Sequence, residues 1–179
     1  MSYSFSENRR GEEHLTKILK EMKTMYVKVG FPSGKEPGEP TKGSESESKT
    51  MADIALIAAT QEFGTTRAGR GNSVTIPSRP FMRPALVTNK EKLAKLQKKL
   101  SSEIMSGERT VENGLELIGE FMVSKIKRAI NDVETPPLAM STIKGKGSEK
   151  PLINTGQMRN SVTYIVSDIT KAEPETVKI

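Results

Sequence analysis

The sequence contains no cysteine and no tryptophan, and His14 is its only histidine. Without cysteine, the chain has no disulfide, no thiolate metal ligand and no thiol nucleophile. With a single histidine, neither a zinc site of the usual ligand types nor a histidine-based catalytic triad can be assembled. His14 lies beside the apolar stripe of a predicted helix and has no set of partners, so we interpret it as a packed or solvated side chain.

Motifs that bind phosphate or mark acid–base catalysis are also absent from the sequence. No G-x-x-x-x-G-K-[ST] pattern occurs, because the run Gly145–Ser148 lacks the earlier glycine. No spacing typical of a paired acid and base is found among Asp53, Glu62, Asp132 and Glu134. A hydrolase with a carboxylate-only site is therefore the weakest alternative, and we predict that the protein is not an enzyme and binds no cofactor or metal.

Aromatic residues make up only 4% of the 179 residues, and hydrophobic residues 34%. The core must therefore be aliphatic and thin, which favours a protein that completes its burial in an assembly. The net charge of +6 permits contact with a nucleic acid or an acidic partner but does not require it. The longest apolar run, residues 52–59, is interrupted by Asp53 and is too short to span a bilayer. We expect no membrane partner.

Apolar residues spaced three and four apart predict several helices. The strongest pattern runs from about residue 108 to 132 and includes Val111, Ile118 and Ile126, so we expect this segment to be the core helix. Further helices are predicted over residues 8–25, 50–63 and 84–105. The apolar stripe of the first of these consists of Leu15, Ile18, Leu19 and Met22.

Residues 32–49 contain no apolar side chain. Such a stretch cannot offset its ordering entropy by burial. We interpret it as a solvent-exposed flap that orders on a neighbouring subunit, with a plain flexible loop as the equal alternative. Loops are also expected at residues 65–75 and 138–150. Alternation and β-branched residues predict strands at 26–31 and 162–166, and an edge strand at 176–179.

Together these elements predict an α+β fold. A small antiparallel sheet packs against a long core helix, with additional helices and long polar loops around them. We expect one domain over residues 1–179. Its parts in chain order are an N-terminal helix and strand (1–31), a flexible polar insert (32–50), a core (51–166) and a C-terminal tail (167–179).

The stretch from Ile76 to Leu86, IPSRPFMRPAL, combines three prolines with two arginines. Proline fixes its own φ, lacks an N–H and biases the preceding residue toward extended geometry. Residues 78–80 therefore cannot form ordinary helix, and a central strand is disfavoured. We predict a stiff extended crossing that is anchored by Phe81 and followed by a helix with Pro84 in its first turn. A proline-rich surface loop is the equal alternative.

Lysines cover the helix predicted over residues 84–105, and Glu91 is the only nearby acid. Such a face can meet phosphate groups by releasing counterions. A solvated helix face is the commoner role of such a run. The candidates for facing DNA are Lys92, Lys95 and Lys99.

Four further motifs follow one another along the chain. They are 62–65 (EFGT), 76–83 (IPSRPFMR), 136–138 (PPL) with Thr142, Lys144 and Gly145, and 151–162 (PLINTGQMRNSV). In this order they resemble the neck and tail-completion proteins of tailed bacteriophages, and the resemblance extends from about residue 51 to 166. The sequence departs from the family pattern at Asn154, where an acid is common, and at Gln157, where a base is common. The polar insert at 32–49 is a third departure.

The resemblance implies a non-enzymatic structural protein of the virion, assembled in the host cytoplasm. Such proteins form a homo-oligomeric ring at the head–tail junction, sixfold in the usual case with a twelvefold ring as the alternative. The implied partners are head-closure or connector proteins on one side and tail terminator or tail tube proteins on the other. Double-stranded DNA passes through the lumen. The resemblance leaves open whether the ring belongs to the neck, to tail completion or to the tail terminator.

In a ring, each subunit presents one patch to a different patch on the next copy. A stiff crossing suits such a contact because it loses little entropy on docking. Arg79 and Arg83 offer forked donors to carboxylates of the next subunit, with contacts inside their own subunit as the equal alternative. The candidate interface residues are Phe63, Arg79, Phe81, Arg83, Asn154 and Arg159.

The alternative function is a small nucleic-acid-binding module that uses the lysine-rich helix around residues 90–99 and a basic loop with Arg67 and Arg70. Aromatic residues do not alternate with the basic ones, which counts against binding of single strands by base stacking. The sequence also contains no recognised DNA-reading motif.

Overall fold

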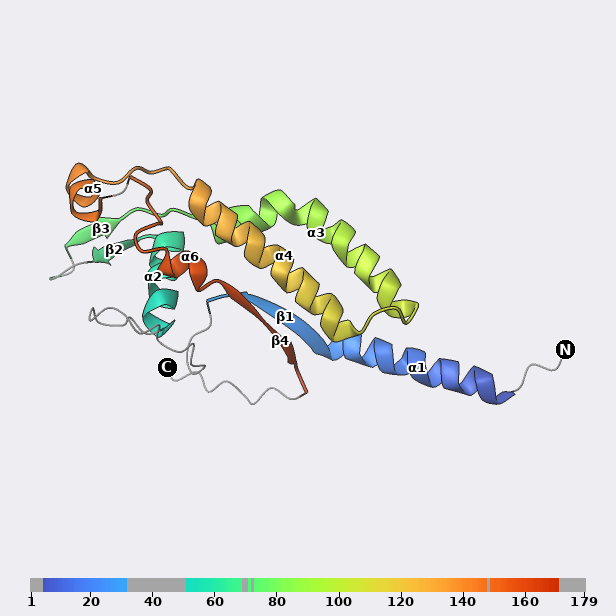
Figure 1. The fold of residues 1–179 in the computed structure, drawn as a ribbon. Coiled ribbons are helices and arrows are strands. Elements are labelled where there is room, and N and C mark those ends of the chain that lie inside the picture. The colour runs from blue at the N-terminus through green and yellow to red at the C-terminus, as the bar shows by residue number, and fades with distance from the viewer. Residues whose placement is uncertain (1–4, 32–50, 69–70, 72, 148, 171–179) are drawn as a thin grey trace. The chain divides into compact units, whose positions relative to one another are not determined.

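The computed structural model describes residues 5–31, 51–68, 71, 73–147 and 149–170. Figure 1 shows the path of the chain through these residues. Its elements in order are α1 (Phe5–Thr24), β1 (Met25–Gly30), α2 (Met51–Phe63), β2 (Thr65–Ala68), β3 (Val74–Ile76), α3 (Met82–Met105), α4 (Val111–Asp132), α5 (Met140–Lys146), α6 (Gln157–Asn160) and β4 (Thr163–Asp168). The α+β class predicted from the sequence is confirmed, with helices far outweighing two small sheets.

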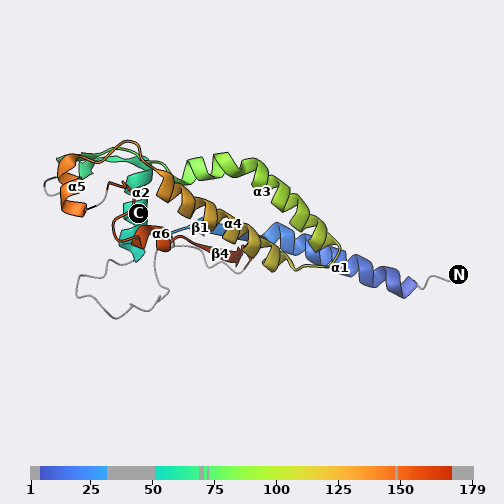
Figure 2. The same cartoon turned by 45° about the horizontal axis from the view of Figure 1, so that its top comes forward.

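The described residues form two compact units. The first unit contains α1, most of β1 and β4, and residues 90–121, whereas the second contains residues 51–89 and 122–163 together with Gly30 and Phe31. The long helices α3 and α4 each contribute residues to both units. Figure 2 shows the two helices from a second direction. The interpretation of residues 1–179 as one domain stays a prediction.

In the first unit, strand β1 pairs with β4, and the N–H of Ile169 donates to the carbonyl of Thr24 at 2.9 Å. The buried cluster of this unit is small. Ile18 of α1 packs against Ile104 of α3 and Val111 of α4, and the partly buried Met25 and Leu115 lie against them. Of the apolar stripe predicted for α1, Ile18 is buried, whereas Leu15, Leu19 and Met22 remain exposed.

The turn between α3 and α4 is held by hydrogen bonds that two of its own residues, Arg109 and Thr110, make with the two helices. Glu103 Oε2 accepts a hydrogen bond from Arg109 Nε at 2.8 Å, and this bond lowers the pKa of Glu103. Thr110 Oγ1 accepts from the N–H of Asn113 at 3.2 Å, so Thr110 caps α4. The cap explains why the helix begins at Val111 and not at residue 108 as predicted.

In the second unit, α2 ends where the sequence predicts, at Gly64. This glycine has a φ of +76° and donates its N–H to the carbonyl of Thr60 at 2.8 Å. The left-handed conformation favours glycine and closes the helix. The chain then enters β2 directly.

Two predicted loops contain regular structure, so these predictions are wrong. Residues 65–75 include the antiparallel pair β2 and β3, with Thr65 opposite Ile76 and Ala68 opposite Val74. The β-branched residues at both ends of this stretch favour strands, and the glycines lie between them. Residues 138–150 include the short helix α5, which ends at Gly147 with a φ of +70°.

The remaining predictions of elements that fall within the described residues agree with the structure. The helices predicted at 8–25 and 84–105 correspond to α1 and α3, and the core helix corresponds to α4. The strands predicted at 26–31 and 162–166 correspond to β1 and β4. The polar insert at 32–50 and the edge strand at 176–179 lie outside the described residues. No helix in the part of the chain that is described is both long and apolar enough to cross a bilayer.

Gly119 allows β4 to lie against α4 in the first unit. It is buried, and a Cβ atom at this position would lie 2.5 Å from Cγ of Tyr164 on β4. No real Cβ contact is that short, so any larger residue must displace the tyrosine ring or the strand. The prediction that the small sheet packs against the long core helix is thereby confirmed.

We predict that Gly119→Ala lowers the free energy of unfolding by about 1–3 kcal/mol, because the added methyl group overpacks this contact. Chemical denaturation of both proteins measures the difference in the free energy of unfolding. Gly11→Ala in α1 is the matched control, because no atom lies within 4 Å of its added Cβ. That control should be neutral or more stable by up to about 1 kcal/mol, the gain in helix propensity. Equal stability of Gly119→Ala and the wild type would contradict the prediction.

Candidate functional site

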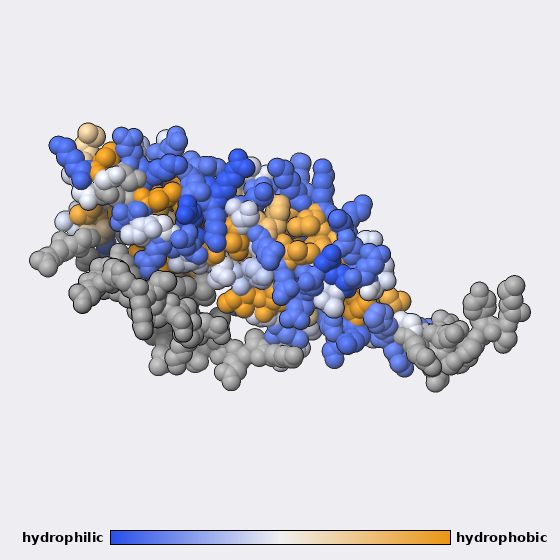
Figure 3. Space-filling model, viewed as in Figure 1, coloured by the Kyte–Doolittle hydropathy of each residue, from blue (hydrophilic) through white to orange (hydrophobic). Residues whose placement is uncertain are grey.

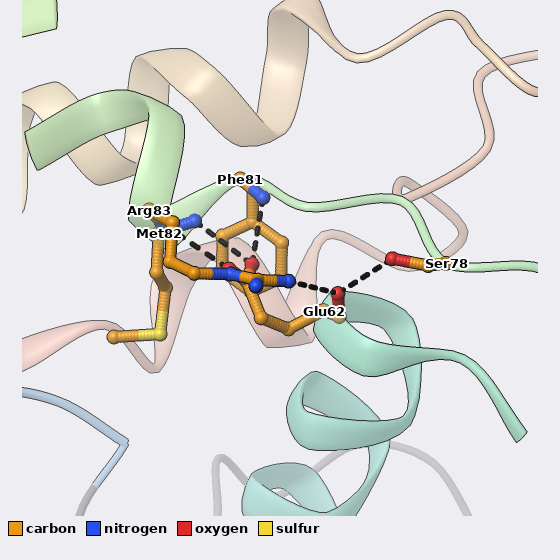
Figure 4. A network of polar contacts seen from close by, with 5 residues as sticks. All are labelled: Glu62, Ser78, Phe81, Met82 and Arg83. Carbon is orange, nitrogen blue, oxygen red and sulfur yellow. Dashed lines mark hydrogen bonds and ion pairs between the residues drawn. The ribbon is translucent and has the colours of Figure 1, made fainter. Parts of the chain in front are cut away.

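The carboxylate of Glu62, in the last turn of α2, caps the N-terminus of α3. Its Oε2 accepts hydrogen bonds from the N–H groups of Phe81 at 2.7 Å and Met82 at 2.9 Å. Its Oε1 accepts from the N–H of Arg83 at 3.2 Å and from Nε of the same arginine at 3.0 Å. The first N–H groups of a helix have no partner inside the helix, and its dipole favours a negative charge there. We call this arrangement, drawn in Figure 4, the Glu62 cap.

The main chain at the end of α2 also binds the crossing that precedes α3. The carbonyl of Glu62 accepts from Ser78 Oγ at 2.8 Å and from Arg83 Nη2 at 3.3 Å. The carbonyl of Gln61 accepts from the N–H of Arg79 at 2.7 Å. These carbonyls would otherwise be free, since the last carbonyls of a helix have no intrahelical donor. The crossing is therefore fastened to α2 through both backbone and side chains.

Arg79 connects the crossing to the segment that follows α4. Its side chain is buried, with 5% of the residue exposed. Its Nε donates to the carbonyl of Pro136 at 2.7 Å, and its Nη2 donates to the carbonyl of Pro137 at 3.1 Å. Burial lowers the pKa of the Arg79 guanidinium. The proline pair that ends α4 thus supplies two acceptors to a cation from another part of the sequence.

Phe81 is the apolar anchor of the crossing, as predicted. It is fully buried, and its ring packs edge-on against Phe31 with the ring centroids 6.1 Å apart. Pro84 lies in the first turn of α3, also as predicted. The alternative of a proline-rich surface loop does not describe a segment with this anchor and these hydrogen bonds.

The Glu62 carboxylate is ionised in the folded protein at neutral pH. Burial raises its pKa, but hydrogen bonds from the backbone of Met82, Phe81 and Arg83 and from the Arg83 side chain lower it by more, so the net shift is downward. These donors occupy both oxygens. The carboxylate is therefore a structural acceptor rather than a group that is available to transfer a proton to a substrate.

The predicted interface residues lie in different environments. Arg79 and Phe81 are buried, whereas Phe63 and the Arg83 side chain are exposed. The guanidinium of Arg83 lies 5.1 Å from the centroid of the Phe63 ring. Both arginines make contacts within their own chain. Arg79 donates to the carbonyl of Pro136, and the carboxylate partner of Arg83 is Glu62. The expectation that these two arginines bind carboxylates of the next subunit stays a prediction.

The other two candidates come from the last motif. Asn154 is exposed, and Arg159 of α6 donates from Nη1 to Asn131 Oδ1 at 3.3 Å. A turn precedes α6, with Gly156 at a φ of +77° and Thr155 Oγ1 accepting from the N–H of Gln157 at 3.3 Å. Because α6 packs against α2, this motif belongs to the same unit as the Glu62 cap.

Sequence reasoning missed Glu62 as the central residue. A signal for it exists, because a glutamate in the last turn of a helix is unfavourably placed against the helix dipole. Such a residue, followed by the Phe63-Gly64 stop, must be compensated by donors from elsewhere in the chain. The Arg-Pro-Phe-Met-Arg run at 79–83 supplies those donors.

The lysines that were proposed to face DNA lie in the first unit. Lys92, Lys95 and Lys99 are exposed. They share one face of α3, because Lys95 follows Lys92 by three residues and Lys99 follows Lys92 by seven. Lys99 Nζ lies 3.7 Å from Glu103 Oε1. Among the residues that the structure describes, no cluster of His, Cys, Asp or Glu side chains is arranged to hold a metal ion.

No protein-family model, no curated protein and no solved structure matches this chain. The candidate site therefore rests on its own geometry.

We predict that Glu62→Gln is less stable than the wild type at pH 7, by about 1–3 kcal/mol, because the amide leaves backbone donors unsatisfied. The native pKa of Glu62 lies below its ordinary value of 4.5, so the ionised cap stabilises fully above that value. Its contribution is lost as the pH falls through the native pKa. The stability gap between the two proteins should therefore narrow as the pH falls below about 4.5.

Unfolding by denaturant at a series of pH values measures this gap. Glu134→Gln, at an exposed position of the same unit, is the control and should change stability by no more than about 0.5 kcal/mol. A gap for Glu62→Gln that stays constant down to pH 2 would show that the charge of the cap contributes nothing.

Proposed function

We propose that this protein is a structural component of a tailed-phage virion. In this proposal it forms a ring at the neck that joins the head connector to the tail, and double-stranded DNA passes through the ring. The observation that carries the proposal is that all four stretches of the family-like pattern lie in the second unit, three of them bound to one another through Glu62 and Arg79. These hydrogen bonds hold the motifs in a fixed arrangement, as a structural role requires.

The surface of the protein supports an assembly role. Large apolar side chains are exposed in the second unit at Leu56, Phe63, Val87 and Met140, each by about two thirds or more of its surface. Figure 3 shows apolar residues among the charged ones on one face of the molecule. Aromatic and arginine side chains are enriched in interfaces, and the exposed Phe63 and Arg83 lie against each other. The expected neighbours are a second copy, connector proteins and tail terminator or tail tube proteins.

The second candidate function is binding of nucleic acid through α3. The observation in its favour is that Lys92, Lys95 and Lys99 are exposed on one face. In a ring, such a face could line the DNA passage. As an isolated module, it could bind DNA without reading its sequence.

We predict that loss of the gene from the genome that encodes this protein leaves filled or empty heads and separate tails. Negative-stain electron microscopy of the resulting lysates checks this outcome. Expression of the wild-type protein in trans should restore joined particles, and Glu134→Gln should restore them equally well. Fully joined virions in the absence of the protein would overturn the neck function.

The alternative makes a separate prediction about salt. If the α3 lysines bind phosphates, then the logarithm of the DNA association constant falls with the logarithm of salt concentration by about 0.9 per neutralised phosphate. Replacing Lys92, Lys95 and Lys99 with glutamine should reduce that slope by up to about 3, measured by fluorescence anisotropy with a labelled duplex. The same replacement of the exposed Lys17, Lys20 and Lys23 in α1 is the control. A salt-independent signal for the wild type would exclude the module.

A further inference from the structure

Helix α1 leaves most of its apolar stripe uncovered. Ile18 is 7% exposed, whereas Leu15 is 41%, Leu19 48% and Met22 37% exposed. In proteins, most of the stability of a helix comes from packing of its apolar face rather than from propensity. We call two of its exposed residues, Leu15 and Leu19, the α1 stripe.

The same unit contains an apolar groove that none of the described residues of the unit fills. The groove has a volume of about 230 Å³ and lies among the end of α1, the start of β1, α3 and α4. Sites for drug-sized ligands enclose roughly 300–1,000 Å³, so this groove suits aliphatic side chains better than such a ligand. The apolar side chains that line it include Met22, Met25, Leu100, Ile104, Leu115 and Ile118.

We propose that the α1 stripe of one copy docks in this groove on the next copy. The inference rests on the proposed function in one respect, because a ring requires a contact between two different patches of the same chain. A helix that inserts side chains one turn apart into an apolar groove is a common mode of recognition. The stripe and the groove form such a pair.

The chain cannot fill its own groove with its own stripe. Met22 already lines the groove, and Leu15 lies seven residues earlier on the same continuous helix. At 1.5 Å per residue, this separation is about 10 Å along a rigid rod. Leu15 therefore cannot fold back into the groove of its own copy.

Two observations favour a second copy in head-to-tail orientation over other occupants. A contact of this kind covers both apolar surfaces at once, whereas a symmetric pairing of two α1 helices would leave the groove open. Charges at the borders are also complementary. Glu12, exposed, borders the α1 stripe, and Lys98, exposed, follows Gln97 on the α3 wall of the groove. Opposite charges at the rim of an interface steer association and fix its orientation.

The test uses two full-length variants, each with one half of the contact removed. The stripe variant carries Leu15→Glu and Leu19→Glu, both at exposed positions, so its fold should be retained. The groove variant carries Ser101→Arg, which places a long charged side chain on the groove wall. Analytical ultracentrifugation over a range of concentrations measures association, and circular dichroism with thermal unfolding confirms that each variant is folded.

We expect the wild type to form oligomers larger than a dimer as its concentration rises. Each variant alone should stay monomeric, with association weakened at least tenfold. An equimolar mixture of the two should form a dimer and nothing larger, because only one intact stripe and one intact groove meet. A monomeric wild type, a groove variant that still associates, or a mixture that stays monomeric would each overturn the proposal.

Matched controls separate the contact from general effects of charge. Lys20→Glu changes the net charge by the same amount as the stripe variant but lies on another face of α1. Ser102→Arg adds the same side chain as the groove variant at an exposed residue outside the groove. Both should associate like the wild type. Because the assay needs no phage particle, its failure leaves the gene-loss experiment as an independent test of the neck function.

Discussion

The second unit depends on one buried carboxylate that satisfies the start of a helix distant in sequence. Glu62 accepts three backbone N–H groups at the beginning of α3 and a fourth donor from Arg83. A buried charge is costly unless donors surround it, and a helix N-terminus is costly to bury unless acceptors meet it. Each group meets the need of the other. The direction in which α3 leaves the crossing is set by this pairing.

This pairing explains why the motifs occur together. The EFG turn supplies the carboxylate and the helix stop, and the crossing supplies the donors and the anchor Phe81. The proline pair after α4 supplies carbonyls for Arg79. If one of these segments were removed, hydrogen-bonding groups of another would lose their partners. A unit built in this way holds its surface residues in defined positions.

The long helices can be predicted from the sequence because their apolar residues recur with helical period over many turns, as in α3 and α4. The β2–β3 hairpin and α5 cannot be predicted in the same way, since they are short and their stability comes from neighbours. The crossing can be identified from its prolines alone. Its partners cannot, because the hydrogen bonds to Glu62, Pro136 and Pro137 join residues 19 to 58 positions apart. The helical periodicity of α1 also does not reveal which of its apolar residues stay exposed. Their exposure depends on which other elements of the first unit pack against them.

The buried guanidinium of Arg79 has a consequence for how the chain matures. Its two acceptors lie 57 and 58 residues downstream, beyond the whole of α4. While the chain emerges from the ribosome, this cation cannot leave water until the proline pair has been synthesised. In a truncated polypeptide that stops within α4, Arg79 would either be buried without its two acceptors or remain in contact with water. Closure of the second unit therefore requires that the chain has been synthesised to the proline pair beyond α4.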